Sequence, residues 1–231
     1  MIIRKQSLLS GARRSIGLGI ILIVTFVLYR IVTTAFVIRT VEVIGSGVEV
    51  SLDESKLTKN LLLFPAQKIR ERLLHDNPLL RDVVIRKKYP HTLVIEPVKR
   101  SATALLVTGD QSVLLDSEGV VLPQSEIREP LPTIIINIGT VHIGQSVTDY
   151  GIAVSLRLLQ KLGDSWYISL ITKHEGGLLV AKYRETEIFF TQEANPAALI
   201  ATLQTLLTGF RIKGSLPKVI DLRFDKPIVT F

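Results

Sequence analysis

Two short stretches of the sequence contain residue types that could carry out catalysis. Gly163-Asp164-Ser165 resembles the sequence around the catalytic serine of some hydrolases, but no strand is predicted before the serine to form a nucleophile elbow. Gly163 instead suits the left-handed position at the end of a helix. His174-Glu175 begins like a zinc-protease motif, but Leu178 stands where the second histidine is required. We therefore predict a helix end and a turn at these two places.

The remaining polar residues give little support for an enzyme. The histidines at 75, 91, 142 and 174 lack the spacing of metal ligands, and the chain has no cysteine, which excludes disulfides and cysteine-based zinc sites. No acid–base pair with supporting spacing is found. We predict no catalytic residue, no metal, no cofactor and no small-molecule substrate. A membrane-tethered envelope enzyme stays open as an alternative, because carboxylates can converge from distant parts of a chain.

The positive charge is concentrated at the amino terminus. The net charge is +7, and residues 1–29 account for +4 of it with four basic residues and no acid. The rest of the chain therefore has a small excess of charge spread over a large surface. Arg86-Lys87-Lys88 alternates between two faces of a strand, and only 6% of all residues are aromatic. We predict a solvated strand face, with a protein or lipid-headgroup contact as the alternative, and no nucleic-acid binding.

A long apolar run follows the basic terminus. Ile16 to Ala35 is a stretch of 20 residues that contains one charge, that of Arg30. At about 1.5 Å per residue this run spans roughly 30 Å, the thickness of the bilayer core. We predict a transmembrane helix over residues 15–38, anchored by residues that include Ile16, Ile21, Val27 and Arg30.

The arginine and the flanking charges set the orientation that we expect. Arg30 lies near the outer end and can extend its side chain to the headgroups, with pairing to a partner helix as the alternative. The basic residues place residues 1–14 in the cytoplasm and the body outside, as a single-pass type II protein of the plasma membrane. A cleaved signal peptide ending near Thr33 or Ala35 is less favoured, because the apolar run is too long for a typical h-region.

The next 70 residues predict a small α+β domain. Phe36–Gly47 alternates as a strand, and the capping box Ser51-Leu-Asp-Glu54 predicts a helix to about Leu63. Pro65 opens a second helix that buries Ile69, Leu73 and Leu74 and ends at Asn77-Pro78. Two strands follow, joined at Pro90-His91. Pro97 should make the last strand bulge or end, because proline cannot donate to the ladder. An exposed edge of such a hairpin could accept a strand from a partner.

The rest of the chain predicts a β-rich α+β region that contacts the first. Its elements are expected as follows: a hairpin at Ser112–Pro123, a strand at Leu131–Gly139, a helix at Asp149–Leu162, strands within Trp166–Thr191 broken at Gly176-Gly177, a helix at Ala197–Phe210 capped by Asn195-Pro196 and closed by Gly209, and a terminal strand from Ile220 to Phe231 that is either one long strand or kinked at Pro227.

An ordered set of motifs then resembles a known family. The first part looks like a POTRA domain, and the whole is similar to the FtsQ/DivIB cell-division proteins. The matching motifs are Ile38 to Gly45, Asn60-Leu61-Leu62, Asn77-Pro78, Arg86 to Ile95, Leu115-Asp116-x-x-Gly119, Leu131-Pro132 and Ile220-Asp221-Leu222-Arg223. Two positions depart from the pattern: Lys99 stands before Arg100 where an acidic residue is common, and Pro97 stands where an apolar residue is usual.

The resemblance implies a scaffold of the division machinery at the septum. It implies a POTRA domain at 39–107 and a carboxy-terminal domain at 108–231, with the FtsB–FtsL complex and FtsK-like or FtsW/FtsI-like proteins as partners. Carried over by position, the partner-binding residues are Arg223, Phe224, Asp225, Lys226, Ile228, Val229 and Phe231. Arg223 is expected to bind a partner carboxylate in a bidentate pair. A POTRA-bearing export component is the related alternative, although the sequence has no barrel-length run of strands.

Overall fold

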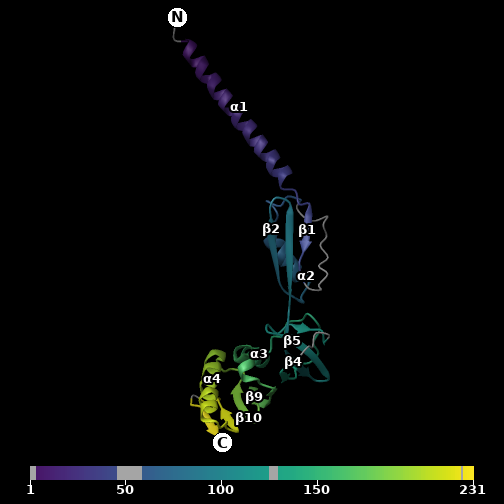
Figure 1. Ribbon diagram of the computed structural model, residues 1–231, viewed down its shortest axis with the longest axis vertical. Coiled ribbons are helices and arrows are strands. Elements are labelled where there is room, and N and C mark those ends of the chain that lie inside the picture. Colours follow the sequence, from purple (N-terminus) through teal and green to yellow (C-terminus); the bar gives the residue numbers. More distant parts are fainter. Residues whose placement is uncertain (1–3, 46–58, 125–129, 225) are drawn as a thin grey trace. The chain divides into compact units, whose positions relative to one another are not determined.

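The computed structural model describes residues 4–45, 59–124, 130–224 and 226–231 (Figure 1). The chain divides into two compact units, Met1–Lys99 and Arg100–Phe231. The division comes earlier than the predicted boundary at residue 107, because strand β4 (Ala102–Thr108) pairs with β5 (Gln111–Asp116) and with β7 (Thr133–Ile135) of the second sheet. The capping box at 51–54 lies outside the described residues.

The first unit opens with the helix α1, Arg4–Ala35, of 32 residues. Within it, Gly17–Ala35 is long and apolar enough to cross a membrane by length and composition. Ile21, Val27 and Arg30 lie in this stretch, and none of its side chains is fully buried in the protein. The helix starts before the predicted span of 15–38 and stops at Ala35, because Val37 already forms a β-bridge with Asn60. These features indicate a single-pass membrane anchor.

A three-stranded sheet with one helix follows α1. Its strands are β1 (Thr40–Val43), β2 (Leu80–Lys88) and β3 (Thr92–Lys99), and the spatial order is β1-β3-β2, with β1 parallel and β2 antiparallel to β3. The helix α2 (Ala66–Asp76) buries Leu73 against the sheet, with Ile69 and Leu74 beside it, as its spacing predicted. The core of this unit contains Leu61, Phe64, Leu73, Leu80, Val83, Leu93 and Ile95.

Two predictions for the first unit need correction. Of the helix expected up to Leu63, the described residues 59–63 are not helical, since Asn60 and Leu61 bond to Val37 and Phe36 instead. Strand β3 also continues through Pro97 to Lys99, and the register shift lies in β2 between Leu80 and Asp82. The N–H of Ile44 donates to the carbonyl of Ile95, so the backbone groups of Ile95 point to the β1 side of β3. By alternation the nitrogen of Pro97 points to the same side, beyond the end of β1 at Val43. Proline is therefore tolerated at this position.

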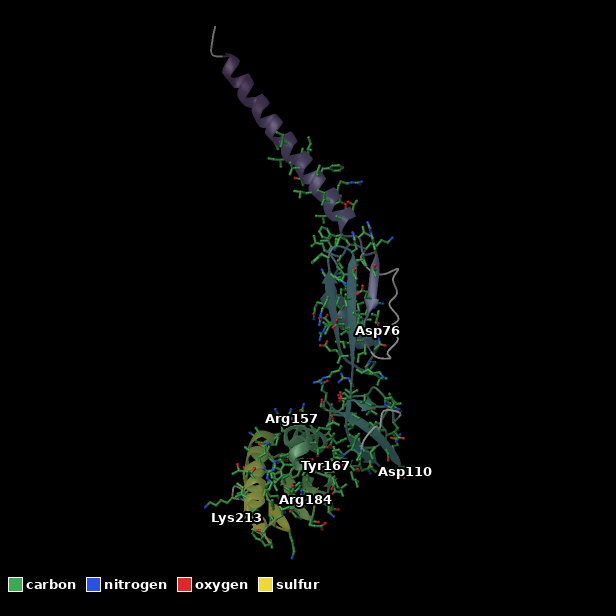
Figure 2. The ribbon with its side chains drawn as sticks, in the orientation of Figure 1. Asp76, Asp110, Arg157, Tyr167, Arg184 and Lys213 are labelled. Carbon is green, nitrogen blue, oxygen red and sulfur yellow. The ribbon has the colours of Figure 1, made fainter. Side chains whose placement is uncertain are left out.

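The second unit contains one mixed sheet. Over the described residues it has nine strands in the order β12-β11-β10-β9-β8-β7-β4-β5-β6. Besides β4, β5 and β7, these are β6 (Val121–Leu122), β8 (Leu170–Lys173), β9 (Leu178–Tyr183), β10 (Thr186–Thr191), β11 (Val219–Asp221) and β12 (Ile228–Thr230). Figure 2 shows the side chains of this unit, with exposed charges such as Asp110, Arg184 and Lys213 on its outside.

Two helices cover one face of this sheet. The helix α3 (Tyr150–Leu162) connects the parallel neighbours β7 and β8, and α4 (Pro196–Lys213) connects the parallel neighbours β10 and β11. Strands β8 and β10 are both antiparallel to β9, so the two crossovers move in the same direction along the sheet. Right-handed crossovers in the same direction place both helices on the same face. The opposite face carries no described helix.

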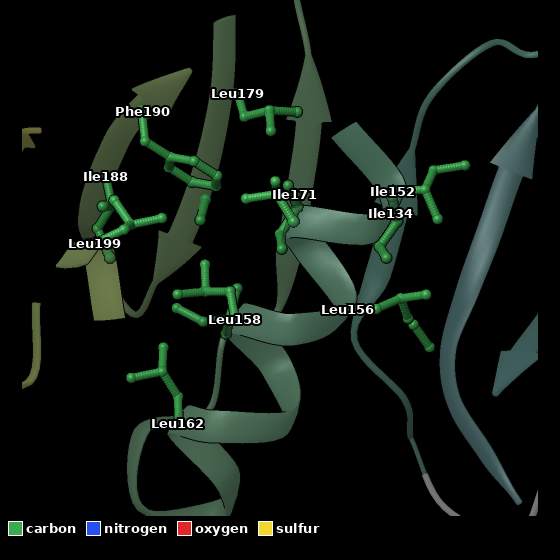
Figure 3. Close-up of a cluster of buried hydrophobic side chains, with 14 of the residues drawn as sticks. Ile134, Ile152, Leu156, Leu158, Leu162, Ile171, Leu179, Ile188, Phe190 and Leu199 are labelled. Carbon is green, nitrogen blue, oxygen red and sulfur yellow. The ribbon is translucent and has the colours of Figure 1, made fainter. Parts of the chain in front are cut away.

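The covered face encloses the main hydrophobic core. Residues of α3 such as Ile152, Leu156 and Leu158 pack against strand residues such as Ile171 and Phe190 (Figure 3). Along β4, β9 and β10 the buried residues alternate with less buried ones, which is the period of a sheet that is buried on one face. The core therefore fixes the register of the strands up to β11.

The helix limits follow local signals. Asp149 accepts a hydrogen bond from the backbone N–H of Ile152 at the start of α3, and Asn195 accepts bonds from Ala197 and Ala198 at the start of α4, with Pro196 in the first turn. The end of α4 was predicted wrongly. Gly209 lies inside the helix, and Gly214, with a φ of 71°, provides the left-handed cap.

The terminal strand was also predicted wrongly. Residues Ile220 to Phe231 form neither a single strand nor a kinked one. They fold back as the hairpin β11–β12, with Val219 opposite Thr230, Ile220 opposite Val229 and Asp221 opposite Ile228. The last strand β12 consequently becomes the edge of the second sheet.

Candidate partner-binding edge

The strand β12 offers an unpaired backbone edge. In the described part of the chain it pairs with β11 on one side and with no strand on the other. It is three residues long, about 10 Å at the rise of a β-strand. Lys226 and Pro227 precede it, and such residues limit indiscriminate pairing at sheet edges. The edge therefore suits a specific added strand more than uncontrolled aggregation.

Hydrogen bonds on the far side of β11 show which backbone groups face this edge. Glu187 N donates to Lys218 O at 2.8 Å, and Leu222 N donates to Phe189 O at 2.8 Å. In this parallel pairing the backbone N–H and C=O of Ile220 point to β10, so those of Val219 and Asp221 point to β12. Their partners Thr230 and Ile228 then face β11, and the N–H and C=O of Val229 point to the open edge. Val229 is the backbone position that an added strand would use.

Three apolar side chains beside this edge are more than half exposed: Phe224, Ile228 and Phe231. Phe231 lies in edge-to-face contact with Phe210 of α4, with the ring centroids 5.7 Å apart. Ile228 lies on the other face, in register with Asp221 and Phe189. An added strand would therefore find apolar contacts on both faces of β12.

Arg223 is committed to an ion pair within the hairpin. Its Nε and Nη2 donate to the two carboxylate oxygens of Asp221, the shortest of these bonds being 2.6 Å, and its backbone N–H donates to the same side chain at 3.0 Å. The hydrogen bond from Arg223 holds the pKa of Asp221 below its usual value. The Nε and Nη2 groups of Arg223, which were expected to bind a partner carboxylate, therefore bind the carboxylate of Asp221 in the same chain.

The ion pair places Arg223 over aromatic rings. Its guanidinium lies 5.4 Å from the centroid of Phe224 and 6.0 Å from that of Phe189. These distances are within the range of cation–π attraction. The position of Phe224 is thus linked to the carboxylate of Asp221. Asp221 and Phe189 were missed as site residues, and the only sequence signal was the spacing Asp221-x-Arg223.

The other predicted site residues are placed in part. Lys226 and Ile228 are exposed, and Val229 is partly buried. Asp225 lies outside the described residues. The structure thus brings Arg223, Phe224, Ile228, Val229 and Phe231 together around one hairpin.

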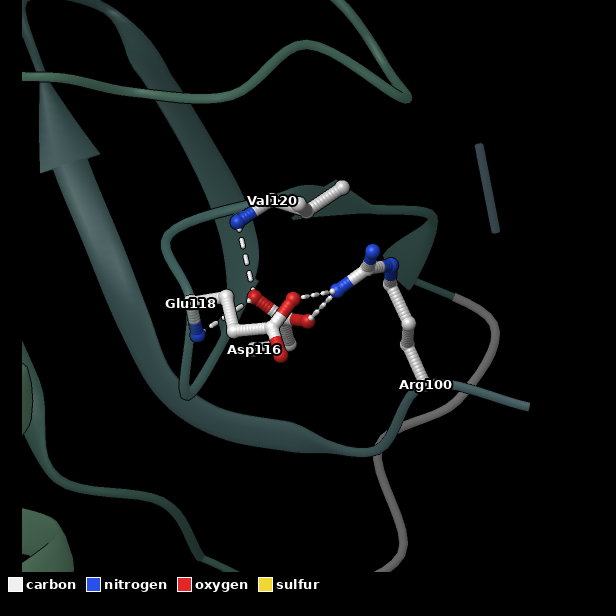
Figure 4. A network of polar contacts seen from close by, with 4 residues as sticks. All are labelled: Arg100, Asp116, Glu118 and Val120. Carbon is white, nitrogen blue, oxygen red and sulfur yellow. Dashed lines mark hydrogen bonds and ion pairs between the residues drawn. The ribbon is translucent and has the colours of Figure 1, made fainter. Parts of the chain in front are cut away.

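A buried charge network stabilises the start of the second unit (Figure 4). Arg100 Nη1 donates to Asp116 at 2.5 Å and to Glu118 at 2.6 Å. The second oxygen of Asp116 accepts the N–H groups of Glu118 and Val120, which shapes the turn between β5 and β6. Burial alone would lower the pKa of Arg100, but the bonds to Glu118 and Asp116 raise it. Because both carboxylate oxygens of Asp116 bond to groups of the same unit, this network is structural.

The stretches that could have been catalytic form ordinary structure. Gly163–Trp166 is a short 3-10 helix after α3, and His174-Glu175 leads into the turn before β9. Among the described residues, no group of three or more histidine, aspartate or glutamate side chains is arranged to hold a metal ion.

A helix long enough to cross a membrane, followed by a strand–helix–strand–strand unit, defines the class of membrane-associated POTRA proteins. Residues 38–100 match the family model described as "POTRA domain, FtsQ-type". Residues 38–100 therefore form a POTRA domain of the FtsQ type, in agreement with the resemblance to the FtsQ/DivIB cell-division family. A search of curated proteins finds no match.

Proposed function

We propose that this protein is a scaffold of the bacterial division machinery, anchored in the plasma membrane by α1. Its amino terminus lies in the cytoplasm, and the POTRA domain and the second unit lie outside, at the septum. The main observation that supports this proposal is the unpaired edge of β12 in a chain that has an FtsQ-type POTRA domain. Such a protein works by recruitment and needs no catalytic group.

Recruitment proceeds by strand addition. An extended segment of an FtsB–FtsL-like complex pairs with the outward N–H and C=O of Val229, and its side chains contact Phe224, Ile228 and Phe231. Main-chain bonds supply an affinity that depends little on sequence, while the aromatic and aliphatic contacts select the partner. FtsK-like or FtsW/FtsI-like proteins are further candidates for binding through the POTRA domain.

The binding step is tested with Val229→Pro. Proline removes the outward N–H but leaves the bonds between β11 and β12, so the full-length variant should keep its circular dichroism spectrum and lose the FtsB–FtsL-like complex in pull-down. The control is Ile143→Ala, because Ile143 is exposed and its neighbour Gly144 bonds to Val121 of β6, at the opposite end of the sheet. Full binding by Val229→Pro would refute docking at β12.

The orientation is tested by cysteine labelling, because the natural chain has no cysteine. A membrane-impermeant maleimide applied to spheroplasts should label Ile143→Cys and leave Ser10→Cys unlabelled until the membrane is opened. The reverse pattern would overturn the proposed topology. Depletion of the protein should give filaments of undivided cells, and normal division after depletion would contradict the division role.

A further inference from the structure

We propose that the end of the POTRA domain next to α1 binds the surface of an anionic lipid bilayer. The binding surface, called here the juxtamembrane patch, consists of Leu62, Leu63, Lys87, Lys88 and Tyr89. The inference rests on the proposed membrane anchoring by α1 and adds a second, peripheral contact with the same membrane.

Contacts within the first unit hold the patch at the outer end of α1. The side-chain amide of Asn60 donates to Val32 O at 2.7 Å. Val32 lies three residues before Ala35, the last residue of the candidate span. At about 1.5 Å per residue this carbonyl is roughly 4.5 Å from the end of the helix. Asn60 and its neighbours therefore lie at the depth of the lipid headgroups when α1 spans the bilayer.

Asn60 also shapes the loop that carries two exposed leucines. Its Oδ1 accepts the N–H of Leu62 at 3.0 Å and that of Leu63 at 3.2 Å. Leu61 and Phe64 on either side are buried in the core, whereas Leu62 is 42% and Leu63 is 65% exposed. Two adjacent leucines held outward between buried residues contribute little to the core. An apolar loop at this depth can insert between the headgroups and the acyl chains.

Aromatic and basic side chains surround the loop. Tyr89 is more than half exposed, and its ring contacts that of Phe36, directly after α1, with the centroids 5.8 Å apart. Lys87 Nζ donates to Leu62 O at 3.0 Å. Tyrosine is enriched at membrane interfaces, where its ring is apolar and its hydroxyl is hydrated. The patch thus combines an apolar tip with an interfacial aromatic residue.

The charge of the surrounding segments favours anionic lipids. Residues 30–41, 59–64 and 86–92 contain six lysines and arginines and no aspartate or glutamate: Arg30, Arg39, Lys59, Arg86, Lys87 and Lys88. Clusters of basic residues next to a membrane span are attracted to anionic headgroups. A bilayer that contains phosphatidylglycerol can attract the basic residues and accept the exposed leucines, whereas a neutral bilayer can only accept the leucines.

The test uses single-cysteine variants of the full chain, labelled with the environment-sensitive dye NBD and reconstituted in vesicles that contain phosphatidylglycerol. A dye at Leu63→Cys should shift its emission to the blue and be quenched by headgroup spin-labelled lipid several-fold more than a dye at Ile143→Cys. Ile143 is a matched control, because it is an equally exposed aliphatic residue, 62% against 65%, in the second unit. A dye at Val27→Cys, near the middle of the span, reports whether α1 is inserted through its quenching by lipid that carries the spin label on the acyl chain.

The outcomes separate this inference from the anchoring on which it rests. A quenched Val27 dye with a Leu63 dye that behaves like the Ile143 dye would overturn the juxtamembrane patch alone. An unquenched Val27 dye would overturn the anchoring as well. Protection of the Leu63 dye that requires a co-reconstituted division protein would show that a protein occupies the patch, against the proposal.

The charge component is tested with Lys88→Glu in the Leu63→Cys chain. This variant should reduce quenching in phosphatidylglycerol vesicles several-fold and should have little effect in phosphatidylcholine vesicles. Lys182→Glu on β9 makes the same charge change on an exposed lysine of the second unit and should leave quenching unchanged. Equal quenching in neutral and anionic vesicles would overturn the assignment to anionic lipid.

Discussion

The two units end their sheets in edge strands of opposite character. In the first unit β2 has nine residues, and Arg86 and Lys88 are exposed along it. In the second unit β12 has three residues, and Ile228 and Phe231 are exposed beside it. Charged side chains on an edge strand discourage pairing with another chain. On the proposed function, strand addition would therefore take place at β12 and not at β2.

One ion pair from each unit shows a second difference, in how far its side chains are buried. In the second unit Arg100 and Asp116 are buried, with side-chain exposures of 13% and 3%. In the first unit Arg70 of α2 pairs with Asp82 of β2 at 2.7 Å, with exposures of 37% and 41%. Water screens the exposed pair, whereas removal of one partner leaves an uncompensated charge at the buried pair. Similar pairs should therefore contribute very differently to stability.

The largest expected effect is that of Asp116→Ala. It removes the buried one of the two carboxylates that pair with Arg100 and the acceptor of two backbone N–H groups, so the free energy of unfolding of the second unit should fall by about 3–5 kcal/mol. The single tryptophan, Trp166, is buried in this unit and reports its unfolding in urea. A loss below about 1 kcal/mol, the value of an exposed pair, would refute the contrast.

The next largest effect is expected from Ile228→Lys, which gives β12 a charge like that of β2. Binding of the FtsB–FtsL-like complex should weaken by about 2 kcal/mol, roughly 30-fold, as for a residue at the centre of an interface. Lys88→Gln on β2 should leave this affinity unchanged in the same titration. Equal effects of the two variants would remove the distinction between the edges.

A smaller, pH-dependent effect is expected at the β11–β12 hairpin. The bond from Arg223 lowers the folded-state pKa of Asp221 below its usual value of 3.8. A lowered folded pKa contributes stability above the unfolded pKa and loses it as the pH falls through the folded value. Hydrogen exchange of β12 should therefore accelerate as the pH falls below about 4, once corrected for its intrinsic rate. Asp221→Asn should lack this dependence, and a variant that retains it would disprove the role of the pair.

The smallest effect is expected from Asp82→Asn. The exposed pair with Arg70 should contribute about 1 kcal/mol or less to the first unit. Hydrogen exchange of α2 and β2 measures this loss, while the Trp166 unfolding transition should not move. A loss as large as that of Asp116→Ala would show that exposure does not separate the two pairs.

Local signals in the sequence predicted much of the fold. The predicted helix start at Asp149, the cap at Asn195-Pro196 and the proline at 65 agree with the observed helix starts to within one residue. The spacing of Ile69, Leu73 and Leu74 predicted the buried side of α2. Signals of this kind act within one or two turns of chain, so they can be read without knowledge of the fold.

Partner binding at Arg223 to Phe231 stays a prediction, but the structure shows how the described residues of this segment are arranged. Arg223 was expected to bind a partner carboxylate, whereas its side chain pairs with Asp221. The fold-back of β12 brings Asp221 and Arg223 into one turn, and their pairing could not be read from alternation alone. The wrong end of α4 has the same origin, because Gly209 and Gly214 differ in backbone conformation and not in residue type.

The sequence by itself determined the membrane-length helix, the helix starts and the alternation of the strands, because each depends on residues that are neighbours in the chain. Only the tertiary structure decided that both crossovers cover one face, that β12 is the edge and that Val229 turns its backbone outward. These features depend on hydrogen bonds between strands distant in sequence, and alternation is the same whichever neighbour a strand pairs with.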